Sequence, residues 1–177
     1  MRLIGLLYGA TLLAACGTEP SSPPPPFVGK IVFASDRARL DGKPLLYSMN
    51  VDGTGIAQLS ISLPGPLRLP SVSPDGRRLM FTRDGVYMVD AGGLNLDHVL
   101  TGQEGVGGRF DPTGNRMVFV SAGTDGSDLS MLDLGTRVAT KLIDTPGYSE
   151  SQPSWSADGQ WICYTRGPTD DSGPEQV

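Results

Sequence analysis

The sequence contains few of the residues on which most enzyme sites depend. Its 177 residues include a single histidine, His98, and two cysteines, Cys16 and Cys163. A Ser–His–Asp triad therefore has one candidate base, and no G-x-S-x-G nucleophile elbow occurs anywhere in the chain. Metal sites built on histidine are equally unsupported, and His98 is expected at the surface. We expect no catalytic residues, no metal and no cofactor.

Positive charge and helical patterns are also scarce. The formal net charge is -5, and clusters of Lys and Arg suited to nucleic acid or to an anionic membrane surface are lacking. After the first fifteen residues, no long window has apolar residues at helical spacing. The chain holds 24 Gly and 15 Pro, a composition that favours many short strands joined by tight turns. This composition predicts an all-β fold.

The N-terminal segment has the pattern of a secretion signal. Arg2 provides a positive start, and the apolar run over residues 3–15 is too short to span a bilayer. Residues 13–16, Leu-Ala-Ala-Cys, resemble the lipobox of bacterial lipoproteins. The resemblance implies a signal peptide over residues 1–15, cleavage before Cys16 and attachment of lipid to that cysteine. An ordinary cleaved signal followed by an incidental cysteine is the alternative.

A Pro-rich stretch follows the cysteine, and we interpret residues 16–27 as a tether. Pro-rich sequence extends by about 3.1 Å per residue, so this one reaches roughly 30 Å from a lipid anchor. By the lipoprotein family's rule, Gly17 rather than Asp after the cysteine points to the outer membrane. The expected location is the bacterial cell envelope, facing the periplasm. Cys163, which has no pairing partner if Cys16 is lipidated, is expected to be a small buried hydrophobe.

Three similar stretches predict β-hairpins. Ser or Asp at the first place, Pro at the second and Gly at the fourth are typical of a type I β-turn. Eight residues after the start of each turn comes an aromatic residue, preceded by an apolar pair that indicates a strand buried on both faces. The turns are Ser73, Pro74, Asp75 and Gly76; Asp111, Pro112, Thr113 and Gly114; and Ser156, Ala157, Asp158 and Gly159.

A second pattern recurs in step with these hairpins. Residues 45–53, 85–93 and 128–136 each alternate and end in a turn, and weaker strands follow over 56–60, 94–101 and 138–143. The unit is therefore four strands in about 40 residues without a helix, which predicts a β-propeller of four-stranded antiparallel blades. A β-sandwich with coincidental turns is the alternative, but it would not keep the motifs in phase.

The stretches PSVSPDGRRLMFTR and VYMVDAGG resemble the repeats of TolB-type propellers, a WD-repeat-like family. The resemblance covers residues 30–177, and we assign the partial propeller to 28–177. The strand count gives a three-stranded blade, two full blades and a two-stranded blade, about three and a half in all. Because an open ring exposes apolar blade faces, we expect that Val177 is not the natural end and that the chain is a fragment or a shortened gene product.

The predicted function follows from the surface and from the resemblance. In a propeller, the loops from second to third strands gather with the blade connections on one face, and Arg and Tyr there suit a protein partner. The resemblance implies a non-catalytic protein that binds a cell-envelope partner such as a peptidoglycan-associated lipoprotein. A lipid anchor departs from TolB itself, which is usually soluble. The candidate partner-binding residues are Arg37, Arg39, Arg68, Arg83, Arg109, Tyr148 and Arg166.

A peptidase-associated propeller is the alternative function, and a lyase is disfavoured. A propeller that gates a prolyl-oligopeptidase-like peptidase predicts a catalytic domain beyond Val177. A propeller lyase acting on sugar acids requires several inward-facing histidines, which the sequence lacks. The acidic loops at Asp125, Asp128, Asp170 and Asp171 do not have the spacing of a calcium loop.

Overall fold

The structure is a computed structural model that describes residues 27–37, 41–101 and 105–170. All regular structure in these ranges is β-strand. No helix capable of crossing a membrane occurs among the described residues. The predicted signal peptide over 1–15, Cys16, the tether up to residue 26 and Arg39 lie outside the described residues.

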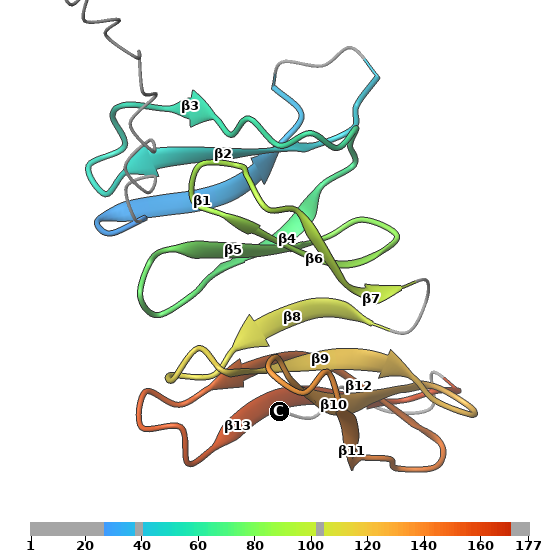
Figure 1. Ribbon diagram of the computed structural model, residues 1–177. Helices are drawn as coiled ribbons and strands as arrows, with labels where there is room; N and C mark the ends of the chain where they lie inside the picture. Colours follow the sequence, from blue (N-terminus) through green and yellow to red (C-terminus); the bar gives the residue numbers. More distant parts are fainter. Residues whose placement is uncertain (1–26, 38–40, 102–104, 171–177) are drawn as a thin grey trace, which may run out of the picture.

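The strands form four antiparallel sheets that follow one another along the chain, and we name them blades 1 to 4 (Figure 1). Blade 1 contains β1 (Lys30–Ser35), β2 (Leu45–Asn50) and β3 (Ala57–Gln58). Blade 2 contains β4 (Arg68–Val72), β5 (Arg78–Thr82), β6 (Gly85–Asp90) and β7 (Asp97–Thr101). Blade 3 contains β8 (Val106–Phe110), β9 (Arg116–Ala122), β10 (Ser127–Asp133) and β11 (Ala139–Ile143). Blade 4 contains β12 (Tyr148–Trp155) and β13 (Ile162–Pro168). The prediction of a partial propeller with four-stranded antiparallel blades is confirmed.

The hairpin turns share one set of hydrogen bonds. In blade 2 the Gly76 N–H donates to the Ser73 carbonyl at 2.8 Å, and the Ser73 hydroxyl donates to the Asp75 carboxylate at 2.6 Å. In blade 4 the corresponding distances are 3.0 Å from Gly159 to Ser156 and 2.6 Å from Ser156 to Asp158. Each turn is therefore closed by its backbone and reinforced by a hydroxyl–carboxylate pair.

Blade 3 keeps this geometry with the two side-chain roles exchanged. Asp111 stands where the other turns have serine, and the Thr113 hydroxyl donates to its carboxylate at 2.8 Å. The backbone N–H groups of Asn115 and Arg116 also donate to Asp111, each at 3.0 Å, and so does the Arg116 guanidinium. Burial raises the pKa of Asp111, whereas the hydrogen bonds from these donors lower it. The hydrogen bonds together have the larger effect, so the pKa of Asp111 lies below its ordinary value.

The turns of consecutive blades touch, which explains why proline and glycine recur in them. A side chain at Gly114 would meet Pro74 at 3.4 Å, and one at Gly159 would meet Pro112 at the same distance. The proline of one turn thus packs on the glycine of the next. Ala157 replaces proline in blade 4, the last blade that the structure describes.

Arginines on the second strands also join neighbouring blades. Arg78 lies over the ring of Phe110 at 5.4 Å and donates to the Gly114 carbonyl at 2.7 Å. Arg116 lies over the ring of Trp155 at 5.4 Å. Since each arginine reaches the first strand of the following blade, the contact is repeated around the axis.

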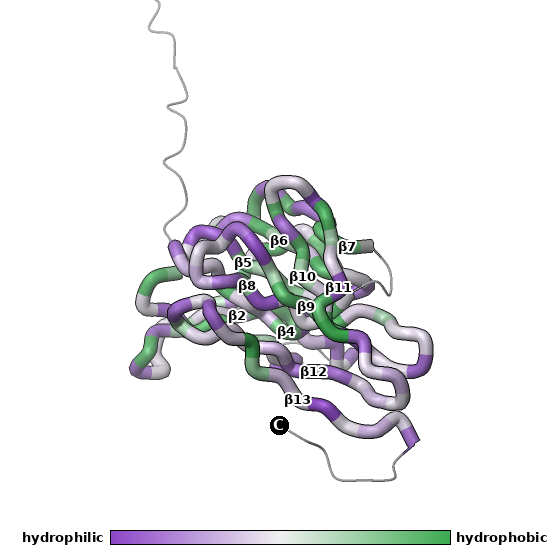
Figure 2. Tube along the Cα trace, turned by 90° about the horizontal axis from the view of Figure 1, so that it is seen from below, coloured by the Kyte–Doolittle hydropathy of each residue, from purple (hydrophilic) through white to green (hydrophobic). Residues whose placement is uncertain are grey.

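Apolar side chains fill the spaces between blades. One cluster, which includes Leu46, Leu79 and Phe81, joins blades 1 and 2, and another, which includes Met80, Phe110 and Met117, joins blades 2 and 3. The hydrophobic stretches accordingly run along strands such as β6 and β9 (Figure 2). The central strands of blades 2 and 3 are buried on both faces, as predicted.

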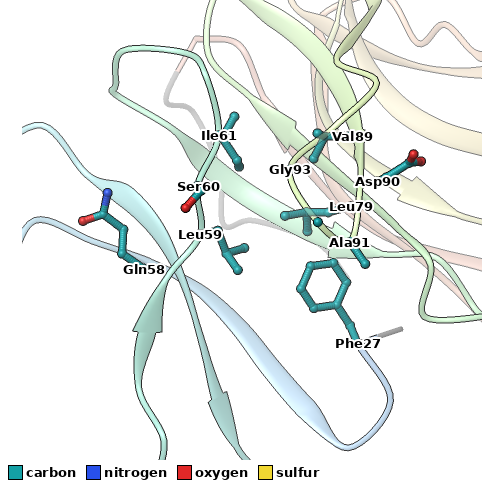
Figure 3. Close-up of a pocket in the computed structure, with 11 residues that line it drawn as sticks. Phe27, Gln58, Leu59, Ser60, Ile61, Leu79, Val89, Asp90, Ala91 and Gly93 are labelled. Atoms are coloured by element: carbon teal, nitrogen blue, oxygen red, sulfur yellow. The ribbon is translucent and has the colours of Figure 1, made fainter. Parts of the chain in front are cut away.

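Phe27 corrects the predicted tether boundary. The sequence analysis assigned residues 16–27 to the tether, yet Phe27 is buried in the cluster between blades 1 and 2. Its ring lies beside Leu79 and Ala91, facing Leu59 across a small cavity of about 110 Å³ (Figure 3). Its N–H also donates to the carbonyl of Gly76. Burial of this phenylalanine stabilises the fold, so Phe27 packs as part of the propeller rather than as part of a tether.

Cys163 corrects a second prediction, because it is exposed rather than buried. Its equivalents Met80 and Val118 have 0% exposure since the next blade covers them. In the described part of the chain no sheet covers this face of blade 4. The apolar pattern around Cys163 was correctly interpreted as a strand, but its burial depends on a neighbouring blade.

The contact between Gly93 and Ser60 provides a test of blade packing. A Cβ at Gly93 would overlap the Ser60 carbonyl, whereas one at Gly53, in the equivalent turn of blade 1, would meet nothing within 4 Å. Both glycines have positive φ, 78° and 84° respectively. We expect Gly53→Ala to cost about 1–2 kcal/mol for its backbone alone, and Gly93→Ala to cost a further 1–3 kcal/mol, about the usual range for overpacking. Urea denaturation measures both, and equal costs would contradict the packing shown.

The carboxylate of Asp111 predicts an acid-sensitive turn. Because its pKa is lowered on folding, it stabilises the fold above its unfolded pKa of about 3.9, and this stabilisation is lost as pH falls through the folded pKa. Asp111→Asn should cost about 2 kcal/mol at pH 7, and the difference from wild type should shrink below about pH 4. The pKa of Asp158 is also lowered by hydrogen bonds of its turn, but this carboxylate is exposed, so Asp158→Asn should show a smaller pH-dependent difference than Asp111→Asn. A pH-independent difference in denaturant midpoints for Asp111→Asn would contradict this assignment.

Candidate functional site

Two kinds of loop meet at one end of the blades, which we call the loop end. The loops from second to third strands contact the connections that lead into the next blade. The Leu67 N–H donates to the Pro44 carbonyl at 2.8 Å, and the Gly147 N–H donates to the Asp125 carboxylate at 3.1 Å. These bonds hold loops of different blades together, so the loop end is a continuous surface supported by rigid sheets.

The first strand of each of blades 2 to 4 carries the same β-bulge next to this end. Register shifts occur between Arg68 and Ser71 in β4, and at equivalent places in β8 and β12. The bulges contain residues in the left-handed region, with φ of 50° at Leu69, 66° at Gly107 and 51° at Gln152. Sequence reasoning missed them, because only Gly107 signals a positive φ.

Leu69 is the most unusual of these positions. A left-handed backbone is unfavourable for leucine by about 1–2 kcal/mol, and yet this side chain remains 46% exposed. It contacts Gly107 in the next blade, where a Cβ would lie 3.6 Å from the Leu69 Cδ1 atom. Strained backbone that holds an apolar side chain in solvent is a common feature of binding surfaces.

A groove lies beside Leu69, between blades 1 and 2. It has a volume of about 480 Å³ and is open to solvent. Its lining combines apolar and charged groups: Ala34, Ser35, Asp36, Gly42, Pro44, Arg68 and Leu69. The groove is large enough for several side chains of a peptide.

Two of the predicted arginines lie on first strands, close to the bulges. Arg68 is exposed at the groove, and within the described residues it has no hydrogen bond or ion pair. Arg109 is half-buried on β8, donates to the neighbouring Gly108 carbonyl at 3.1 Å, and has its pKa lowered by burial. Neither guanidinium is paired with a carboxylate that the structure describes. Each can therefore donate hydrogen bonds to a carboxylate of a ligand.

The other predicted residues are placed around the loop end. Arg37 lies over the rings of Phe33 and Tyr47 at 5.0 and 5.3 Å, on the open face of blade 1. Arg166 lies over the ring of Tyr148 at 4.9 Å in blade 4. Arg83 is half-buried in the loop between β5 and β6. Tyr148 and Arg166 are thus brought together, while Arg37, Arg109 and the blade 2 residues Arg68 and Arg83 are spread over blades 1 to 3.

His98 is exposed on the outermost strand β7, as predicted. Its ring stacks on Tyr87 with centroids 4.1 Å apart. The Tyr87 hydroxyl donates to the Asp84 carboxylate at 2.7 Å, which lowers the pKa of Asp84. Burial first and this hydrogen bond second raise the pKa of Tyr87. The imidazole is therefore part of an aromatic stack on the side of blade 2.

Acidic residues do not gather into a cation site in the described ranges. No group of three or more His, Cys, Asp or Glu side chains is placed to hold a metal ion there. Asp128, which the sequence analysis placed in an acidic loop, is buried on β10, and its carboxylate pairs with the Lys141 ammonium at 2.7 Å. Lys141 also pairs with Asp144 at 2.9 Å.

Solved structures similar to this chain are propellers. TolB of Agrobacterium tumefaciens has a TM-score of 0.70 at 18% identity, with 82% of this chain and 53% of that chain covered. TolB from Acinetobacter baumannii has a TM-score of 0.67 at 20% identity, with coverages of 86% and 39%. The β-propeller domain of the Trilobed protease from Pyrococcus furiosus has a TM-score of 0.52 at 12% identity, with coverages of 84% and 53%. Neither a family model nor a curated protein matches the chain.

These similarities establish the fold. The described residues form a TolB-like partial propeller, which agrees with the resemblance in the repeat sequences. The chain spans about half or less of the length of these structural neighbours. One propeller fold serves binding proteins and peptidases alike, so activity has to be argued from the loop end itself.

Proposed function

We propose that this chain is a non-catalytic cell-envelope lipoprotein whose TolB-like propeller binds a protein partner at the loop end. The observation that carries the proposal is Leu69, a strained and exposed leucine beside the groove that Arg68 lines. Arginine is enriched at the energetically important centres of protein interfaces, and here an exposed apolar side chain stands next to a guanidinium that is unpaired among the described residues.

The position of this centre supports a protein as the ligand. Leu69 and Arg68 stand on β4, within a sheet whose central strands are fully buried, so the binding groups are held rigidly. Val106, the equivalent of Arg68 in blade 3, is 42% exposed and extends the apolar surface. A surface that continues across two blades suits an extended partner segment better than a compact metabolite.

The cellular location is part of the same proposal. The lipobox-like residues 13–16 and the Pro-rich tether support lipid attachment at Cys16 and display of the propeller into the periplasm, with the outer membrane as the expected anchor. A peptidoglycan-associated lipoprotein is the first partner to test, because similarity to TolB supports this class. The alternative, a propeller that gates a peptidase, has support from similarity to the Trilobed protease domain, at a lower TM-score.

The partner proposal can be tested by site-specific photo-crosslinking in the native host. With p-benzoylphenylalanine in place of Leu69, we expect a crosslinked envelope protein that mass spectrometry identifies. The same probe in place of Val51, which is 73% exposed at the opposite end of blade 1, should give none.

A purified partner then separates binding from folding. Because Leu69 is exposed and strained, Leu69→Gly should change the free energy of unfolding by less than about 1 kcal/mol while weakening partner binding at least tenfold. Equal crosslinking from both positions, or full binding by Leu69→Gly, would remove the loop end from the proposal.

The lipid anchor has its own test. Cys16→Ala removes the sulfur that would carry lipid, so the variant should move from the membrane fraction to the soluble fraction of the cell. Cys163→Ala, which removes the other cysteine, should leave membrane association unchanged. Retention of the Cys16→Ala protein in membranes would show that lipidation of Cys16 is not the anchor.

A further inference from the structure

Blade 3 differs from blades 1 and 2 at one position of the repeat's third strand, which is paired with a phenylalanine of the second strand. In blade 1 Tyr47 is paired in register with Phe33, and in blade 2 Tyr87 is paired with Phe81. The ring centroids of these pairs are 5.8 and 5.7 Å apart, and both are stacked. In blade 3 the residue paired with Phe119 is Ser130. A phenol ring is therefore replaced by a hydroxymethyl group at this position.

A cavity occupies the corresponding place in blade 3. It has a volume of about 290 Å³ and lies between β7 of blade 2 and strands β9, β10 and β11. Phe119 and Leu100 supply its apolar walls together with two alanines, and Ser121, Ser130 and Lys141 supply its polar groups. This cavity is open to solvent, and its volume exceeds the roughly 150 Å³ of a cavity that can hold benzene, so a substituted aromatic ring fits it.

The polar groups around the cavity match those around Tyr87 in blade 2. There the ring is stacked against His98, and its hydroxyl donates to Asp84. In blade 3 Lys141 stands at the register position of His98, since Tyr87 pairs with His98 and Ser130 pairs with Lys141. An ammonium group at this place can lie over an aromatic ring, which is a favourable cation–π geometry.

The charges favour a neutral ring over an acid. Lys141 is already paired with Asp128 and Asp144. Two carboxylates therefore surround one ammonium group, and the net charge beside the cavity is negative. The Asp128 side chain is only 4% exposed and does not line the cavity, but it holds the Lys141 ammonium in place at 2.7 Å. The hydroxyls of Ser121 and Ser130 lie 2.8 Å apart at the same cavity and offer a hydrogen-bond partner to a hydroxyl group.

We propose that the cavity at Ser130 is a binding site for a neutral phenol ring, which takes the place that tyrosine occupies in blades 1 and 2. The ring packs on Phe119, its hydroxyl bonds to the pair of serine hydroxyls that lines the cavity, and Lys141 covers its outer face. The ligand is a free phenolic compound or a tyrosine side chain of another protein, which have this chemistry in common. The site is separate from Leu69 and does not depend on the partner-binding proposal.

Titration of the isotope-labelled full chain with p-cresol, followed by amide NMR shifts, tests the site. We expect saturable shifts centred on β9, β10 and β11, with p-cresol binding about tenfold more tightly than toluene, because its hydroxyl bonds to the pair of serine hydroxyls. The anion p-toluate should bind more weakly than p-cresol. A tyrosine peptide blocked at both ends distinguishes the sources: binding of p-cresol alone assigns a small phenol, and binding of both assigns a tyrosine side chain.

Variants that fill the cavity make the test specific. Ser130→Tyr restores the ring found in blades 1 and 2. Ala139→Leu narrows the cavity from β11, where the side chains are exposed and a substitution should change the stability of the fold little. Both should abolish the shifts, whereas Ser154→Tyr on the exposed face of β12 should not. Absence of saturable p-cresol binding by the wild-type chain, or unchanged binding in both filled variants, would overturn the proposal.

Discussion

Contact between the apolar faces of consecutive blades is the interaction on which the rest of this structure depends. A single blade has hydrophobic residues on both faces, so it gains most of its stability only when a neighbour covers each one. Phe81 and Met80 illustrate this, because they are adjacent on β5 and serve the two different interfaces of blade 2. Cys163 illustrates the opposite, since the same strand position is exposed where no described blade follows.

Contacts at the ends of the strands fix the angle between neighbouring blades. At the turn end, Pro74 and Pro112 pack on glycines of the next turn, and Arg78 and Arg116 reach aromatic rings of the next blade. The exchange of roles between Ser73 with Asp75 and Asp111 with Thr113 shows what the turn requires. The turn needs one hydroxyl and one carboxylate two residues apart, in either order. Together they accept hydrogen bonds from the backbone N–H groups at the start of the second strand.

The loop end is distinguished by a bulge that recurs in the first strands, whereas the left-handed non-glycine residues of the turn end, Asn95 and Arg137, lie in tight turns. Three bulges on first strands place residues in the left-handed region, and two of these residues are not glycine. Such strain persists only where the surrounding sheets are rigid, and the buried β5 and β9 provide that rigidity. The same architecture tolerates the loss of a ring at Ser130, since the adjoining strands keep Phe119 in place and a cavity results.

The sequence alone determined the all-β fold, the blade repeat and the positions of the hairpin turns. These features depend on local patterns: turn residues at fixed spacing, apolar runs and the absence of helical periodicity. The candidate arginines on the loop face were predicted as a group, because strand order assigns each loop to one end of a blade. The bulge at Leu69 could not be predicted, since leucine does not indicate a positive φ.

Tertiary structure decided everything that depends on the neighbouring blade. It placed Phe27 in the core rather than in the tether, exposed Cys163, and buried Asp128 in an ion pair with Lys141. It also placed Ser130 and Phe119 side by side in the lining of an open cavity. Burial is a property of surfaces brought together from different repeats, and a pattern read along one repeat contains no information about which surface will cover it.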